Sequence, residues 1–243
     1  RKLVRVRVPP WAPKFAMNKP KSPNPKFLWT PDLAYIAGLL TTDGNMSKDG
    51  RHIVMRSSDK DLLKTFNSCL KIKNKIATTH NNGYAKRPSY RVQYSNASLY
   101  RWFVTVGLKP AKTYTIGALK IPKKFFRDFL RGHLDGDGYI QHYIDTYNEY
   151  KGKRYSNKRI YTRFISASKK HIYWLYNMTI KCLPVKGAII FKKGRSEKHV
   201  PMWEIKFAKY ASLKLLKWLY YRRNLPSLNR KRRTAEKLIA SNA

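Results

Sequence analysis

Two aspartates, Asp43 and Asp137, each stand just before a glycine at the end of an apolar stretch that is rich in small residues. The stretches cover residues 36–44 and 130–138, so the two acids are 137 − 43 = 94 residues apart. A carboxylate in the last turn of a helix faces the negative end of the helix dipole, which is unfavourable. A bound cation reverses that cost. The motifs therefore predict that Asp43 and Asp137 share divalent metal ions; no backbone ligand is assigned at Thr42.

Helix signals surround both motifs. A proline stands where each helix would begin, at Pro31 and Pro122. We predict helices over residues 31–43 and 122–136, each closed by a glycine in the left-handed conformation, as is common at helix ends. Small residues four apart would let the two backbones approach closely, by analogy with membrane helices. These small residues are Gly38 with Thr42 and Gly132 with Gly136. The alternative is a pair of ordinary helices followed by Asp-Gly turns.

The composition points to a polyanionic partner. The 243 residues include 52 Lys or Arg and only 13 Asp or Glu, which gives a net charge of +39. Such self-repulsion destabilises a compact state unless a polyanion offsets it, and nucleic acid is the expected partner. A membrane is disfavoured, because the chain has no run of about 18 apolar residues.

Asp135, the third acid in the motifs, is not assigned a catalytic role; we expect it to cap a helix or contact the partner helix.

The two cysteines, Cys69 and Cys182, occupy matching places near the ends of predicted helices. They are expected to be small buried residues. No Cys/His cluster has the spacing of a zinc site, and a disulfide is not expected. The chain therefore fits a reducing, intracellular compartment, either a prokaryotic cytoplasm or an organelle.

The chain contains an internal repeat, because the same predicted order of elements occurs twice: helix, hairpin, helix, hairpin, helix. The predicted fold is mixed α+β with two pseudo-symmetric α-β-β-α-β-β-α repeats, in which two four-stranded antiparallel sheets form a saddle. We divide the chain into a basic, Pro-rich arm (1–29), a first repeat (30–112), a linker (113–121) and a second repeat (122–243) that ends in a basic helix. Trp11, Phe15, Phe27 and Trp29 predict that the arm packs on the body; a disordered tail is the alternative.

The predicted strands alternate apolar residues with basic and polar ones. Such a sheet has one face on helices and one face suited to a duplex groove; a solvated charged face is the alternative. The predicted DNA-binding residues are Asn45, Arg51, Arg56, Arg91, Gln93, Gln141, Arg159, Arg163, Lys186 and Lys192.

Residues 30–235 resemble the LAGLIDADG homing endonucleases in their single-chain, two-motif form. In the second motif Gly132, Asp135, Asp137 and Gly138 match the family pattern closely. The first motif matches at Ala37, Gly38, Leu39, Asp43 and Gly44, whereas Thr41 stands where the family often has Asp. The resemblance implies motif helices at the interface between halves and a monomer that cuts both strands of a long, asymmetric DNA site. It also implies Mg²⁺ or Mn²⁺, with Ca²⁺ able to bind without supporting cleavage.

A basic side chain near each carboxylate would complete such a site. The family's lysine after the last helix of each repeat falls at Lys112 and Lys231, and Gln93 and Lys206, on matched strands, are further candidates. The predicted activity is that of an intron- or intein-type homing endonuclease. The alternatives on the same fold are an RNA maturase that binds intron RNA and a DNA-binding protein that does not cleave.

Overall fold

The structure is a computed structural model that describes residues 27–79, 88–150, 152–194 and 200–242. The first half contains α1 (Pro31–Thr41), β1 (Gly44–Met46), β2 (His52–Ser57), α2 (Lys60–Leu70), β3 (Ala77–Thr79), β4 (Ser89–Ser95) and α3 (Ala97–Val106). The second half contains a 3₁₀ turn (Lys123–Phe125), α4 (Phe126–Asp135), β5 (Tyr139–Tyr150), β6 (Lys153–Ser166), α5 (Lys169–Cys182), β7 (Gly187–Lys192), β8 (Met202–Phe207) and α6 (Lys209–Leu219), followed by α7 (Asn229–Ala240).

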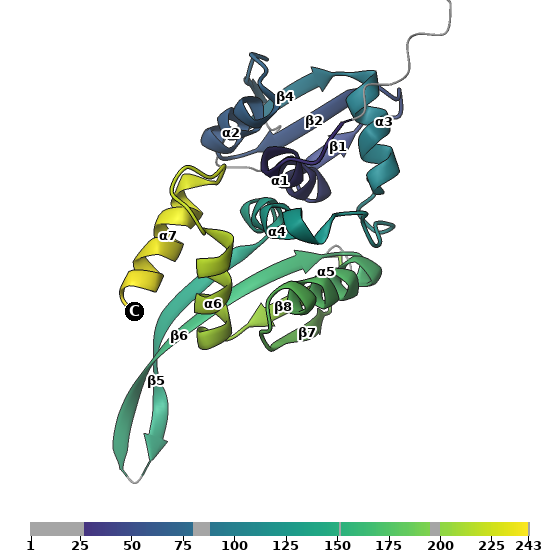
Figure 1. Ribbon diagram of the computed structural model, residues 1–243. Helices are drawn as coiled ribbons and strands as arrows, with labels where there is room; N and C mark the ends of the chain where they lie inside the picture. The colour runs from purple at the N-terminus through teal and green to yellow at the C-terminus, as the bar shows by residue number, and fades with distance from the viewer. Residues whose placement is uncertain (1–26, 80–87, 151, 195–199, 243) are drawn as a thin grey trace, which may run out of the picture.

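Each half has one four-stranded antiparallel sheet, with the strand orders β1-β2-β4-β3 and β5-β6-β8-β7. The predicted α+β fold with two repeats is confirmed. Figure 1 shows α1 and α4 side by side between the two sheets, with the first half at the top and the second half below. The motif helices therefore form the interface between the halves, as expected.

The core is continuous across this interface. Residues 34–41 of α1 are all buried, and α4 buries Phe126, Phe129, Leu130 and Leu134 completely. The Thr30 hydroxyl caps α1 by accepting a hydrogen bond from the Leu33 amide at 3.1 Å, which favours a helix start at this point. Helices cover one face of each sheet, since α2 and α3 pack on β2, and α5 and α6 pack on β8 and β6.

Three details of the predicted motif helices are wrong. The second helix begins at Phe126 rather than Pro122, because a 3₁₀ turn fills the first three positions after the proline. The helices end at Thr41 and Asp135, so Asp43 and Asp137 lie two residues beyond them rather than in their last turns.

The glycines after the two acids do not adopt the left-handed conformation either. A Cβ at Gly44 would lie 2.6 Å from Leu40 Cα, and one at Gly138 would lie 2.8 Å from Leu134 Cα. Close packing against the preceding turn therefore explains these two glycines.

The remaining predictions have mixed outcomes. Phe27 and Trp29 pack on Trp102, with ring centroids 5.9 and 4.7 Å apart, whereas Trp11 and Phe15 lie outside the described residues. Cys69 and Cys182 are free but only partly buried. Within the described ranges, no helix is both long and apolar enough to cross a membrane.

Candidate active site and nucleic-acid interface

The two motif helices touch through their backbones. A Cβ at Gly38 would lie 2.1 Å from Phe129 O, and one at Gly132 would lie 2.1 Å from Tyr35 O. Near the C-terminal ends, a Cβ at Gly136 would meet the Thr42 hydroxyl oxygen at 1.9 Å. Only glycine permits this approach, and the crossing brings the C-terminal ends of α1 and α4 together. The small-residue face predicted from the sequence is the surface that makes this contact.

Asp137 lies close enough to Asp43 to influence its ionisation. Burial, and then the nearby Asp137 carboxylate, raises the pKa of the half-buried Asp43 to about 7. Burial also raises the pKa of Asp137, although part of its side chain reaches solvent. Two carboxylates that repel each other beside a helix end gain stability from a cation.

The donor set suits a hard divalent ion, since carboxylate oxygens are the ligands that Mg²⁺ and Ca²⁺ prefer. Among the described residues, no group of three or more His, Cys, Asp and Glu side chains could hold a metal. A metal ion at this position would therefore have the carboxylates of Asp43 and Asp137 as its candidate side-chain ligands, with water or a phosphate completing the coordination.

Lys112 approaches the acids from the chain after α3. Its ammonium donates a hydrogen bond to Gly44 O, the carbonyl directly after Asp43. It also lines a hollow of about 100 Å³ together with Asp137, Thr41, Thr42 and Ser166. Burial lowers the pKa of Lys112 to about 8. This lysine therefore touches one half of the site and faces the carboxylate of the other.

Lys231 approaches the acids from α7. Its ammonium donates to four backbone carbonyls around Asp137, those of Leu134 (2.6 Å), Asp135 (2.9 Å), Gly136 (3.0 Å) and Gly138 (2.6 Å). Burial lowers its pKa to about 8 as well. Because an ammonium has only three hydrogens, Lys231 is fully occupied as a cap for the end of α4.

Asp135 contacts the partner helix, in line with one of its two expected roles. Its Oδ2 accepts hydrogen bonds from Tyr35 OH at 2.8 Å and from the Leu228 amide at 2.7 Å. The bond from the Leu228 amide holds the residue that precedes α7 against the end of α4, and this positions Lys231 in the first turn of α7. Thr41, the equivalent residue in the first motif, bonds Ala37 O within its own helix at 2.7 Å. Among the described residues of the first half no helix corresponds to α7. An acid at position 41 would therefore meet no amide donor equivalent to that of Leu228.

Gln93 and Lys206 occupy equivalent places in the two sheets. The register aligns Asn45, Val54 and Gln93 in the first sheet, and Tyr139, Arg163 and Lys206 in the second. Gln93 accepts a hydrogen bond from Arg91, and the Lys206 ammonium lies 4.1 Å from the Tyr161 ring centroid. Both residues lie on the outer sheet faces, and the residues aligned with them on the first strand of each sheet, Asn45 and Tyr139, each stand two residues after one of the acids.

The helix-free face of the first sheet carries most of the predicted DNA-binding residues of that half. Asn45, Arg56, Arg91 and Gln93 share this face by register. Arg51 differs, because it lies in the turn between β1 and β2, 3.9 Å from Asp49. The structure therefore groups four of the five residues into one surface.

The outer face of the second sheet carries Gln141, Arg159, Arg163 and Lys192, and Lys186 lies exposed just before β7. Three of these cations already have acidic partners. Arg159 pairs with Asp145 at 2.9 Å, while Arg163 and Lys192 both pair with Glu204 at 2.5 Å. The sequence analysis missed Glu204, although its alternation with Lys206 on one strand places both residues on this face.

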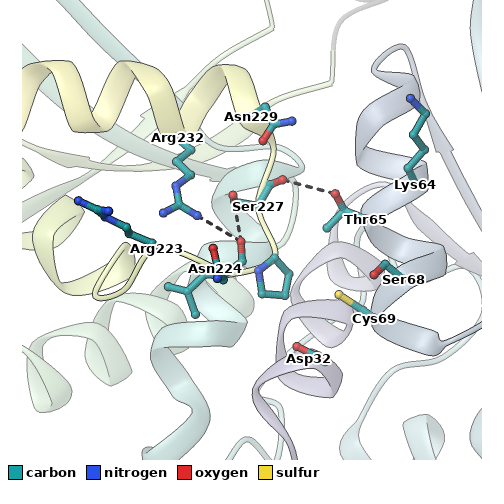
Figure 2. A pocket seen from close by; sticks show the side chains of 12 residues that line it. Asp32, Lys64, Thr65, Ser68, Cys69, Arg223, Asn224, Ser227, Asn229 and Arg232 are labelled. Carbon is teal, nitrogen blue, oxygen red and sulfur yellow. Dashed lines mark hydrogen bonds between the residues drawn. The ribbon is translucent and has the colours of Figure 1, made fainter.

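A larger hollow, of about 570 Å³, lies on the seam where α1 and α2 meet the segment between α6 and α7 (Figure 2). Arg232, one of its cations, bonds Glu236 at 2.7 Å and Leu225 O at 3.4 Å. Lys64 pairs with Asp61 at 3.0 Å. Arg232 and Lys64 therefore already have partners within the protein. The two halves are linked at the edge of this hollow, where the Thr65 hydroxyl donates a hydrogen bond to Ser227 O at 3.5 Å.

The fold recurs in solved structures. I-AabMI, a LAGLIDADG meganuclease bound to uncleaved DNA, is 17% identical with a TM-score of 0.53, covering 88% of this chain and 90% of its own. I-LtrWI, a LAGLIDADG homing endonuclease bound to target DNA, is 14% identical with a TM-score of 0.52, covering 87% and 89%. Full-length DUF199/WhiA from Thermotoga maritima is 10% identical with a TM-score of 0.53, covering 89% of this chain but only 63% of its own. The comparison with curated proteins finds no match.

Fold and site together define a pseudo-symmetric α+β protein with paired acids where its two central helices cross. Residues 30–106 match the family model of the LAGLIDADG-like domain. The chain has the two-motif LAGLIDADG fold.

Proposed function

We propose that this chain is a metal-dependent endonuclease that cuts both strands of a long, asymmetric DNA site, acting as a monomer of the intron- or intein-type homing class. The observation that carries the proposal is the carboxylate pair at the helix crossing, with raised pKa values and with a basic sheet face on either side. I-LtrWI and I-AabMI are described in complex with DNA, and I-DmoI, which has a TM-score of 0.51, in complex with DNA and Ca.

Asp43 and Asp137 would hold the divalent ion, Mg²⁺ or Mn²⁺, through their carboxylate oxygens. A bound ion supplies an activated water at neutral pH and stabilises charge on the leaving oxygen. Because burial raises the pKa of Asp43 to about 7, a proton competes with the cation for this carboxylate near neutral pH. Lys112, with a pKa of about 8, presents positive charge beside Asp137, where it would orient a phosphate.

The test is a cleavage selection on a randomised duplex library in Mg²⁺, with wild type, Asp43→Asn and Asp137→Asn compared. We expect wild type to enrich one cut sequence, each Asn variant to lose cleavage, and all three to keep binding. EDTA should abolish cleavage, and Ca²⁺ should support binding alone. The variant that combines Asp43→Asn with Asp137→Asn is tested in the same way, and full metal-dependent cleavage by it would contradict the assignment.

A second candidate is a DNA-binding protein on the same fold that does not cleave. The occupancy of Lys231 favours it, because all three of its N–H groups are directed at backbone oxygens and none is left for a phosphate. In the same selection, enrichment of a bound sequence with no cut product in Mg²⁺ or Mn²⁺ would identify this function. Tight binding of intron RNA with no enriched duplex would indicate the maturase alternative.

A further inference from the structure

One acid is buried in the middle of the basic outer face of the second sheet. Glu204 lies on β8 between Ile165 of β6 and Ile190 of β7, and it is 0% exposed. Its carboxylate accepts hydrogen bonds from Arg163 Nη1 at 2.5 Å, Lys192 Nζ at 2.5 Å and Tyr139 OH at 3.1 Å. A buried charge is tolerated when it is paired and hydrogen-bonded, and here the partners also cover it.

Contacts with Glu204 and with the neighbouring side chains hold Arg163 in one orientation. Its Nη2 donates to Gln141 Oε1 at 2.9 Å, and its guanidinium lies 5.1 Å from the Tyr161 ring centroid and 5.6 Å from that of Tyr139. The side chain is 13% exposed, and its Nε–H is buried without a partner among the described residues. An arginine held on several sides loses little further freedom when it binds a ligand.

Counting donors shows what this arginine can still bind. A guanidinium has five N–H groups. In Arg163 one on Nη1 is bonded to Glu204, one on Nη2 to Gln141, and Nε–H is buried. One N–H therefore remains on each terminal nitrogen. Two N–H groups on neighbouring nitrogens match O6 and N7 of guanine in the major groove, the commonest specific arginine contact.

The first sheet has no pair equivalent to Glu204 and Arg163 at the matched positions. The residue two positions before Gln93 is Arg91, whereas the residue two positions before the equivalent Lys206 is Glu204. In the ladder, Val54 occupies the place that corresponds to Arg163. The first half thus has neither the acid nor the arginine, and the two sheet faces differ chemically at matched positions.

We propose that Glu204 is a specificity-determining positioning residue, which holds Arg163 as the reader of one guanine in the DNA half-site under the second sheet. The inference rests on the proposed DNA binding and not on cleavage. It assigns Lys192 a structural role as well, because its charge is directed at Glu204 rather than at a phosphate.

The experiment is a binding selection on randomised duplexes in EDTA, so that cleavage does not enter the readout. Wild type is compared with Glu204→Gln, which keeps the shape but loses the charge, and with Arg163→Lys, which keeps a cation but loses the fork. Asp145→Asn is the matched control, since it frees Arg159 on the same face. Thermal unfolding of each variant verifies that it is folded.

Wild type should prefer guanine at one position of one half-site by about 10-fold or more, the range for a good bidentate contact. Glu204→Gln and Arg163→Lys should both lose that preference at the same position, and Asp145→Asn should keep it. The slope of log affinity against log salt should steepen by about one to two for Glu204→Gln, because two cations are released towards phosphates.

Three outcomes would overturn the inference. An enriched sequence whose base preferences are unchanged in Glu204→Gln defeats it while leaving the proposed function in place. So does a loss of preference in Glu204→Gln and Arg163→Lys at different positions. If wild type enriches no sequence at all, both the inference and site-specific DNA binding are wrong.

Discussion

At the scale of single residues, the lysines show how far a family resemblance can be interpreted. The resemblance placed Lys112 and Lys231 near the two carboxylates, and both ammonium groups contact the backbone next to these acids. Their different occupancy could not be predicted. Lys231 has four carbonyl partners because Asp135 draws the start of α7 against the end of α4, and that contact joins residues 93 positions apart.

We predict that Lys231→Met destabilises the protein by about 2–4 kcal/mol, because it leaves several buried carbonyls without a donor. Urea unfolding followed by circular dichroism measures this loss. Lys237→Met is the matched control, since Lys237 is exposed on the same helix, and its effect should stay within about 0.5 kcal/mol. Equal stabilities for the two variants would remove the capping role.

A second residue-scale prediction concerns pH. The folded-state pKa of Asp43, about 7, lies above its usual value, so the folded state binds the proton more tightly than the unfolded state does. Stability from this group is therefore lost as pH rises from about 4 to about 7. Asp43→Asn should match wild type near pH 4 and exceed it by about 1–2 kcal/mol at pH 8, a figure reduced for solvent screening.

The measurement is the free energy of unfolding of both proteins across this pH range in EDTA. Mg²⁺ should raise the stability of wild type at pH 8 and have little effect on Asp43→Asn. Asp61→Asn, an exposed acid on α2, serves as the reference. A stability difference between wild type and Asp43→Asn that does not change with pH would contradict the raised pKa.

At the scale of elements, the periodic segments were predictable and their boundaries were less so. Gly38 and Gly132 indicated a close helix crossing, because small residues four apart leave one helix face without side chains that would hold a neighbouring backbone away. The start of α4 was misplaced, because a proline before a 3₁₀ turn looks in sequence like a proline at the first position of an α-helix. The role of Gly44 and Gly138 was misassigned, since the contacts that exclude a Cβ depend on how the chain turns after each helix.

We predict that Gly38→Ala destabilises the protein by at least about 3–4 kcal/mol, since its Cβ would meet backbone atoms of α4 that cannot shift without separating the helices. Gly117→Ala is the matched control, because a Cβ there meets no atom within 4 Å. Thermal unfolding and expression in soluble form are the measurements. A Gly38→Ala protein as stable as Gly117→Ala would mean that α1 and α4 do not cross at this residue.

At the scale of the whole molecule, most of the fold could be predicted from the internal repeat. The features that could not be predicted are those in which the two halves differ. Matching motifs indicated two like halves, so the two sheets and the central interface could be predicted. Thr41 and Arg91 stand where the second half has Asp135 and Glu204, and no helix among the described residues of the first half corresponds to α7. The roles of Asp135, Glu204 and α7 depend on contacts between strands or between halves.

The hairpin of β5 and β6 is the largest departure from symmetry. These strands contain 12 and 14 residues, against 3 and 6 in β1 and β2. β8 pairs only with residues 162–166 of β6, so the rest of the hairpin continues as a two-stranded arm beyond the helices (Figure 1). On the outer side of this arm β6 carries Asn157, Tyr155 and Lys153, which continue the face of Arg159.

Under the proposed DNA binding, this arm should lengthen the footprint at one end only. At about 3.3 Å per residue, the four residues from 153 to 156 add roughly 13 Å, or about four base pairs. Replacing residues 146–156 with Asn-Gly, a favoured two-residue hairpin turn, keeps the pair of Asp145 and Asn157. The hydroxyl-radical footprint of this variant should be shorter by about three to five base pairs beside the second half-site, while the other end serves as the internal reference. An unchanged footprint would mean that the arm points away from the duplex, and shortening at both ends would mean that the deletion disturbs the sheets themselves.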